Sequence, residues 1–170
     1  MGVIIRPIEE NDAESLWQMM SALDSETKYM MYEPNERTKN IDRMKSAINE
    51  AVTGNNLFLV AEADHEIVGY ISAQKGILKR VKHSAYIVVG IRASYQRQGI
   101  GTSFFKQLDI WASEKGVTRL ELTVMCLNDT AKHLYEKNGF VVEGIKKNSM
   151  VVDGTYVDEY YMAKLFKQQI

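Results

Sequence analysis

The stretch that decides the fold reads Val88-Val89-Gly90-Ile91-Arg92-Ala93-Ser94-Tyr95-Gln96-Arg97-Gln98-Gly99-Ile100-Gly101-Thr102. The β-branched residues at its start predict a strand, and apolar residues at helical spacing after it predict a helix. Between them lies a short polar turn whose glycines, at positions 99 and 101, leave the backbone open to an anion. The first turn of a helix also carries unpaired N–H groups and the positive end of the helix dipole. This combination predicts a site for a diphosphate, with Arg97 adding positive charge at the rim.

The glycine pair has a second interpretation, because Gly-x-Gly at a helix start also allows close packing between elements. Two phosphate-binding motifs are excluded. No Gly-Lys-Ser/Thr follows, as a Walker motif requires, and Phe104 stands where the dinucleotide-binding fingerprint has its third glycine. From the residues alone, the stretch is a candidate phosphate loop.

The patterns on either side predict the element order β-α-α-β-β-β-α-β-α-β-β. Strands are expected at 3–6, 57–63, 67–75, 84–91, 120–124, 140–150 and 156–165, and helices at 15–23, 41–52, 100–115 and 128–137. Asn11-Asp12 is expected to cap the first helix, and residues 29–37 form a loop. Tight turns are expected at 64–66 and at Asp153-Gly154. The strand–helix–strand unit in the second half predicts a parallel pair within a mixed α/β sheet.

The composition indicates one compact domain over residues 1–170, with a formal net charge of −1. That charge gives no general attraction to nucleic acid or to anionic lipid, and no apolar run is long enough to span a membrane. Cys126 is the only cysteine, so no intramolecular disulfide can form, and a cytoplasmic protein is expected. His65, His83 and His133 lack metal-ligand spacing, so no metal is expected.

Two segments carry a resemblance to a known family. Gln96-Arg97-Gln98-Gly99-Ile100-Gly101 resembles the (Arg/Gln)-x-x-Gly-x-(Gly/Ala) signature of the GNAT N-acetyltransferase superfamily, although Ala93 replaces a frequent proline before it. Asn128-Asp129-Thr130-Ala131-Lys132-His133-Leu134-Tyr135-Glu136-Lys137-Asn138-Gly139-Phe140 is similar to the second signature, Asn-x-x-Ala-x-x-x-Tyr-x-x-x-Gly-Phe. The two segments occur in the family's order, with a helix and a strand between them.

The resemblance implies a GNAT-type fold with splayed middle strands and attack of an amine on the thioester of acetyl-CoA. It implies that Val89-Gly90-Ile91 presents backbone groups to the acyl and pantetheine portions, and that a bulge there opens the cleft. The amides from Arg97 to Thr102 would hold the diphosphate. Asn128 would contact the pantetheine, and the Tyr135 hydroxyl would act near the sulfur as general acid. From the pattern alone, Tyr135 also fits a core aromatic and Asn128 a plain helix cap.

The general base is less clearly indicated. Some relatives use a glutamate five residues before the motif asparagine, and that position is Thr123, which cannot serve. Glu121 points to the same face of its strand, as a base or as a solvated carboxylate. Other acidic residues fall in loops or strand ends that suit a cationic amine, with Glu33 as the expected acceptor contact: Glu33, Glu36, Asp153, Asp158 and Glu159.

The acceptor is expected to be a primary amine of a small molecule or a protein N-terminus. A different class of function is a non-catalytic domain that binds or senses acyl-CoA. Tyr135 favours catalysis, whereas Thr123 in place of glutamate favours the alternative. An exposed final strand would allow a homodimer.

Overall fold

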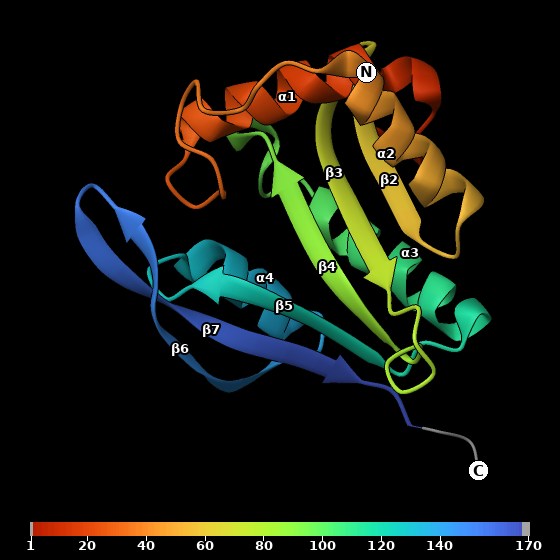
Figure 1. Ribbon diagram of the computed structural model, residues 1–170, viewed down its shortest axis with the longest axis vertical. Helices are drawn as coiled ribbons and strands as arrows, with labels where there is room; N and C mark the ends of the chain where they lie inside the picture. Colours follow the sequence, from red (N-terminus) through yellow and green to blue (C-terminus); the bar gives the residue numbers. More distant parts are fainter. Residues whose placement is uncertain (1, 168–170) are drawn as a thin grey trace.

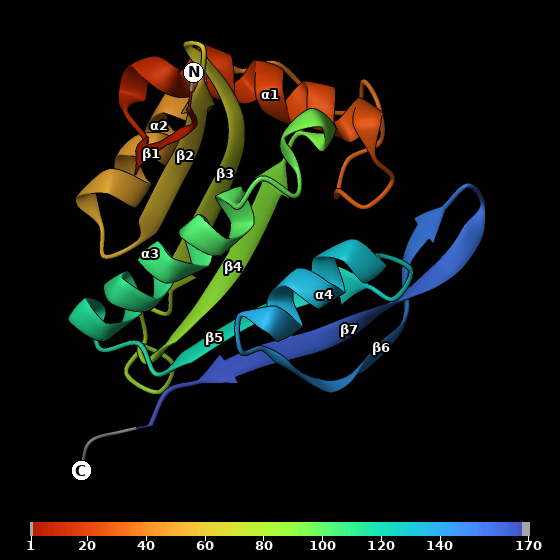
Figure 2. The same ribbon diagram turned by 180° about the vertical axis from the view of Figure 1, so that it is seen from behind.

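The computed structural model describes residues 2–167, which form one seven-stranded mixed sheet with helices on both faces (Figures 1 and 2). The strands are β1 (Ile4–Pro7), β2 (Leu57–Ala63), β3 (Glu66–Lys75), β4 (Ser84–Ile91), β5 (Arg119–Met125), β6 (Val141–Val152) and β7 (Thr155–Leu165). The helices are α1 (Ala13–Glu26), α2 (Ile41–Thr53), α3 (Ile100–Lys115) and α4 (Asp129–Lys137), with 3₁₀ turns at Glu10–Asp12 and Ala93–Tyr95. The predicted element order is confirmed, and the element ends shift by only a few residues.

The sheet order is β1-β2-β3-β4-β5-β7-β6, and every pair is antiparallel except β4 with β5. The predicted parallel pair is therefore confirmed. The final strand is not an exposed edge as predicted, because β7 pairs on both sides and leaves β6 at the edge.

Local chemistry explains the tight turns. Asp153 and Gly154 have φ values of 51° and 74°, and Asp64 and His65 have φ values of 50° and 66°. Positive φ at both central residues matches the right-handed twist of the strands that a two-residue hairpin joins. The predicted capping of α1 is only partly right, because Asp12 occupies the cap position but makes no side-chain cap there. Its carboxylate instead accepts hydrogen bonds from the Arg6 guanidinium at 2.7 and 2.8 Å.

Two apolar cores lie on opposite faces of the sheet. Helices α3 and α4 cover one face, turned toward the viewer in Figure 2, and bury Phe104, Phe105 and Leu108 against the strands. Helices α1 and α2 pack on β3 and β2 on the other face, where they bury Leu16 and Ile48 (Figure 1). In the part of the chain that the structure describes, no helix lies over β5 and β7 on this second face, so that half of the sheet remains open there.

Strands β4 and β5 separate soon after they meet, as Figure 1 shows. Their register covers only three pairs, from Ser84 with Arg119 to Tyr86 with Glu121. The predicted bulge in β4 is wrong, because β4 keeps a continuous register with β3 from Ala85 to Ile91. Strand β5 is paired with β7 along its whole length, so each strand follows its outer neighbour. The twist of a sheet then separates the two halves without a bulge.

Candidate active site

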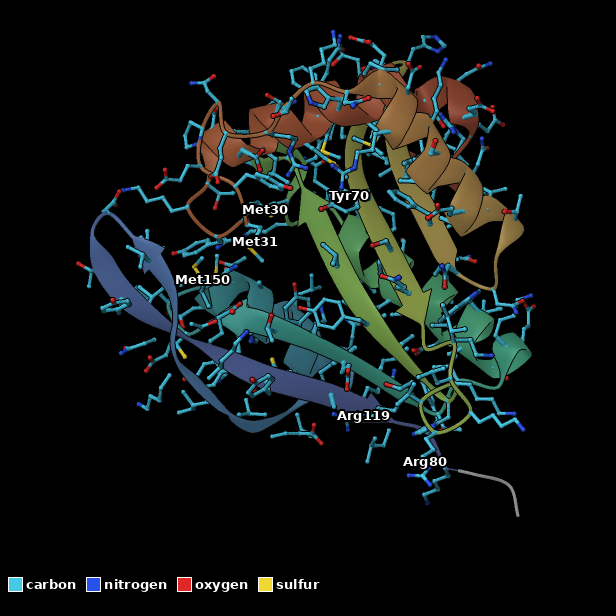
Figure 3. The ribbon with its side chains drawn as sticks, in the orientation of Figure 1. Met30, Met31, Tyr70, Arg80, Arg119 and Met150 are labelled. Atoms are coloured by element: carbon cyan, nitrogen blue, oxygen red, sulfur yellow. The ribbon has the colours of Figure 1, made fainter. Side chains whose placement is uncertain are left out.

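A cleft of about 1310 Å³ occupies the separation between β4 and β5. One end lies between the starts of α3 and α4, on the face that these helices cover. The other end lies on the opposite face, where the loop after α1 and the β6–β7 hairpin approach one another (Figure 3). The cleft therefore connects the two faces of the sheet.

The helix end of the cleft has a run of unpaired backbone donors. Among residues 2–167, no amide from Arg97 to Thr102 donates to a carbonyl or a side chain. The first amide with a partner is that of Ser103, which donates to the Gly99 carbonyl at 3.0 Å. Arg97 has φ 59° and Gly99 has φ 85°, both in the left-handed region. Successive N–H groups in such a turn form a concave anion site.

The charges at this end agree with an anion. The cleft is lined here by Arg97 and Lys137, neither of which forms an ion pair in the described part of the chain. Lys132 is compensated by Glu136, whose carboxylate lies 2.9 Å from its Nζ. Two free cations and six free amides fit the diphosphate of a coenzyme.

Glycine is required at these positions for different structural reasons. A Cβ on Gly99 would meet no atom within 4 Å, so this glycine leaves open space and satisfies a positive φ. A Cβ on Gly101 would lie 2.7 Å from Leu134 Cδ2, and one on Gly90 would lie 2.7 Å from Tyr70 Cε1. Gly101 and Gly90 are therefore needed for close packing. The close-packing interpretation holds for Gly101, whereas anion approach at Gly99 stays a prediction.

Tyr135 lies at the middle of the cleft, on α4. Its ring packs against Phe105 and Phe140, with centroid distances of 5.7 and 6.1 Å, and the residue is 8 % exposed. Burial raises the pKa of the Tyr135 hydroxyl above its ordinary value. No described residue hydrogen-bonds to this hydroxyl. Its oxygen is not fully buried and keeps some solvent-accessible surface. Tyr135 is thus both a packing aromatic and a protonated donor accessible from the cleft.

Asn128 caps α4, and its Oδ1 accepts a hydrogen bond from the Ala131 amide at 3.2 Å. Its Nδ2 has no partner within the described residues and borders the same cleft. The residue can therefore hold the helix start and still donate one hydrogen bond to a ligand.

The opposite end of the cleft is lined by methionine and tyrosine side chains. Met30, Met31 and Met150 gather there, from the loop after α1 and from β6 (Figure 3). Tyr70 borders it from β3, and burial raises the pKa of this phenol to about 12. Tyr86 reaches across from β4 to β5, with its hydroxyl 2.9 Å from Thr123 Oγ1. This end is adapted to a ligand with apolar surface.

Comparison with known proteins decides the family. A model described as the acetyltransferase (GNAT) family matches residues 17–140. The chain belongs to the GNAT family. It is accordingly an acetyl-CoA-dependent N-acetyltransferase that acts on an amine.

Similarity to individual GNAT proteins extends over most of the chain. L-amino acid N-acetyltransferase AaaT of Escherichia coli (strain K12) is 32% identical over 111 residues, which cover 63% of this chain and 67% of the relative. An acetyltransferase of the GNAT family from Streptococcus pneumoniae superposes with a TM-score of 0.92 at 27% identity, covering 98% of this chain and 100% of the other. The yncA structure from Salmonella typhimurium, with its cofactor acetyl-CoA, shares the fold with a TM-score of 0.87 at 18% identity, covering 100% and 97%.

The cleft brings together most of the predicted GNAT site residues: Val89, Gly90, Ile91, Gln96, Arg97, Gly99, Ile100, Gly101, Thr102, Asn128 and Tyr135. Gln98 is outside the lining, because its Nε2 donates to the Ser94 carbonyl at 2.9 Å. Glu33 is also outside it, on the exposed loop, and its contact with the acceptor stays a prediction.

Glu121 lies at the closed end of the separation and not in the cleft lining. Its carboxylate accepts a hydrogen bond from Arg119 Nε at 2.8 Å, and the same guanidinium binds Glu143. The bond from Arg119 lowers the pKa of Glu143. A base role for Glu121 stays a prediction, with its carboxylate held here by a cation.

Of the residues at the acceptor end, the sequence indicated only Glu159, as one of five acidic residues that suit a cationic amine. Tyr70 and Tyr86 fall within predicted strands, and the sequence assigns no role to Met30, Met31 or Met150. These residues reach the cleft because of the order of the strands and the path of the loop after α1. Strand order and loop path are not visible in any short stretch of the sequence. Among residues 2–167, no group of three His, Cys, Asp or Glu side chains is placed to hold a metal ion. No helix within the same range is long and apolar enough to cross a membrane.

Proposed function

We propose that the cleft between β4 and β5 transfers an acetyl group from acetyl-CoA to a primary amine of a small molecule or a protein N-terminus. The observation that carries the proposal is the run of free amides from Arg97 to Thr102, which opens into the same cleft as the Tyr135 hydroxyl. Acetyl-CoA supplies an acetyl group activated as a thioester. The other steps depend on side chains and amides of this chain.

The proposed binding of acetyl-CoA uses the helix end and the middle of the cleft. The amides from Arg97 to Thr102 hold the diphosphate, with Gln96, Arg97 and Gln98 forming the turn that positions them. The Asn128 Nδ2 donates to the pantetheine. The β4 segment Val89–Ile91 offers backbone groups toward the separation, since β5 no longer pairs with it there. Preorganised backbone donors of this kind contribute about 3–4 kcal/mol to transition-state stabilisation in other enzymes.

The proposed chemistry needs a neutral amine and a donor for the leaving sulfur. Deprotonating an amine of pKa about 10 at pH 7 costs roughly 4 kcal/mol, which is a moderate barrier even without a strong base. The Tyr135 hydroxyl is protonated and has no internal partner, so it is free to donate to the departing thiolate. The raised pKa disfavours full proton transfer, so a hydrogen bond that strengthens as charge develops is the expected contribution.

Thiol release tests this function against the non-catalytic alternative. Purified protein with acetyl-CoA is assayed for free thiol in the presence of L-amino acids, alkylamines, spermidine or an alanine-initiated peptide, and products are weighed by mass spectrometry. The proposal expects amine-dependent thiol release together with a singly acetylated product. Binding of coenzyme A without amine-dependent release by any of these classes would instead assign a binding or sensing domain.

Two further assignments belong to this proposal. We place the protein in the cytoplasm, where acetyl-CoA is available and a chain with one cysteine needs no oxidising compartment. We also propose that two copies can pair along the edge strand β6, whose exposed residues include Val141, Ile145 and Val151. Sedimentation equilibrium measures that association directly.

A further inference from the structure

Glu159 is a buried carboxylate at the acceptor end of the cleft. It lies on β7 opposite Met125 of β5, and the residue is 9 % exposed. Neighbouring Tyr160 packs into the core beneath α3 and α4, so Glu159 points to the open face of the sheet. It lines the cleft together with Met125 and Met150.

The carboxylate is only half satisfied. Ser149 Oγ donates a hydrogen bond to Oε1. Oε2 accepts no hydrogen bond from residues 2–167. This oxygen is not fully buried and keeps some solvent-accessible surface. Because Glu159 lines the cleft, that surface faces the cleft. A carboxylate removed from water in this way requires a donor or a counter-charge.

Among residues 2–167, Glu159 is also an uncompensated charge of the cleft, as is Asp129 at the start of α4. Glu26 accepts hydrogen bonds from Arg92 Nε at 2.6 Å and from the Ala93 amide. Arg37 pairs with the buried carboxylate of Asp24 at 2.8 Å. Within the described chain, Glu159 has no cation within ion-pair distance. The acceptor end therefore carries a net negative charge, whereas the opposite end carries free cations.

We propose that Glu159 binds the ammonium group of the acceptor as it arrives, and that the methionine side chains contact an apolar group that carries it. The ammonium group then loses its proton to solvent, and the neutral amine attacks the thioester. This inference rests on the proposed function and names the acceptor class for the same cleft. A cation is the partner that the free Oε2 lacks, and it is the form in which a primary amine arrives at neutral pH. Met30, Met31 and Met150 form a deformable apolar wall at the same end of the cleft (Figure 3). An acceptor with a second charge far from the reacting amine would have to desolvate that charge against the methionine wall, which would weaken its binding.

Steady-state kinetics with hexylamine and 1,6-diaminohexane test both parts. Hexylamine is expected to have the higher kcat/KM, because its chain ends in an apolar methyl group. Glu159→Gln keeps the side-chain size and can still accept from Ser149. It should raise KM for hexylamine about 10- to 100-fold, the usual effect of losing a charged hydrogen bond, and leave KM for acetyl-CoA unchanged. The salt dependence of the hexylamine KM should disappear in the same variant.

The matched control is Asp109→Asn, which removes a carboxylate on α3 that is paired with Lys164 at 2.7 Å and does not line the cleft. This control should leave the KM for hexylamine and the KM for acetyl-CoA unchanged. Equal kinetics of wild type and a folded Glu159→Gln variant would overturn the assignment, as would an equal rise of KM for hexylamine and for acetyl-CoA. If Glu33→Gln carries the amine effect instead, the ammonium lies on the loop and not at Glu159. A protein that binds coenzyme A but acetylates no amine would contradict the proposed function itself.

Discussion

Replacing Tyr135 by phenylalanine separates the two roles of this side chain. The ring contacts with Phe105 and Phe140 remain, and the hydroxyl has no partner in the described structure. The free energy of unfolding should therefore change by less than about 0.5 kcal/mol, as for substitutions that remove no internal bond. Acetyl-CoA affinity should also stay close to that of the wild type.

The catalytic effect should be much larger than the effect on stability. A hydrogen bond to a charged group contributes about 1.5–3 kcal/mol, and each 1.4 kcal/mol is about tenfold in rate. A loss of about 10²-fold in kcat is expected, since the thiolate charge exists mainly in the transition state. The assay is release of free thiol at saturating acetyl-CoA, and single-turnover measurements show whether product release limits the rate.

Two comparisons sharpen the result. The loss should shrink with an acyl donor whose thiol is more acidic, because a better leaving group needs less stabilisation. Tyr160→Phe is the matched control, since this tyrosine packs beneath the Lys132 side chain and does not line the cleft. Wild-type turnover by Tyr135→Phe, with chemistry limiting, would refute the general-acid role and leave Tyr135 as a packing residue.

Further predictions concern the loop, the pH profile and the N-terminal ion pair. Gly99→Ala and Gly116→Ala should each destabilise the protein by about 1–2 kcal/mol, because both glycines have positive φ and open space. Only Gly99→Ala should weaken coenzyme A binding by calorimetry, and equal affinities would remove residue 99 from the site. The value of kcat/KM for the amine should rise up to about pH 9.5, because the raised pKa of Tyr135 keeps its hydroxyl protonated over this range. A decrease of kcat/KM that begins below about pH 9 in the wild type and is absent from Tyr135→Phe would count against this. The hydrogen bond from Arg6 lowers the pKa of Asp12, so its stabilisation is present above about pH 4 and is lost as pH falls further. Asp12→Asn should therefore flatten the acid limb of stability in urea titrations, and an unchanged limb would show that other carboxylates determine it.

Local sequence predicts the elements well because local chemistry determines their ends. Positive φ at Asp153-Gly154 and at Gly116 needs residues that tolerate it, and these residues are visible in the sequence. The periodicity of α3 likewise predicts its buried face. The separation of β4 and β5 was predicted for the wrong reason, since it depends on which strands pair outside them. Such pairing is a property of the whole sheet and has no local signature.

The site divides in the same way. The cofactor end lies within two contiguous segments, so the turn with Arg97 and Gly99 could be proposed from the residues themselves, whereas the role of Asn128 came from the resemblance to the GNAT signature. The acceptor end combines a loop with several strands, and no spacing links Met30 to Glu159. The burial of Glu159 depends on the register of β7 with β5, which the sequence does not reveal. Gly101 shows a further limit, because its contact with Leu134 appears only once α3 and α4 are packed together.

Amide hydrogen exchange at residues 97–102, followed by NMR with and without saturating coenzyme A, tests the cofactor site most directly. These amides have no internal acceptor, so they should exchange fast in the free protein. Coenzyme A should slow several of them by at least about tenfold, since a diphosphate would accept their hydrogen bonds. Amides in the loop 77–80 should not change. If calorimetry shows coenzyme A bound while exchange at 97–102 is unaltered, the diphosphate lies elsewhere and the cleft between β4 and β5 is not where acetyl transfer occurs.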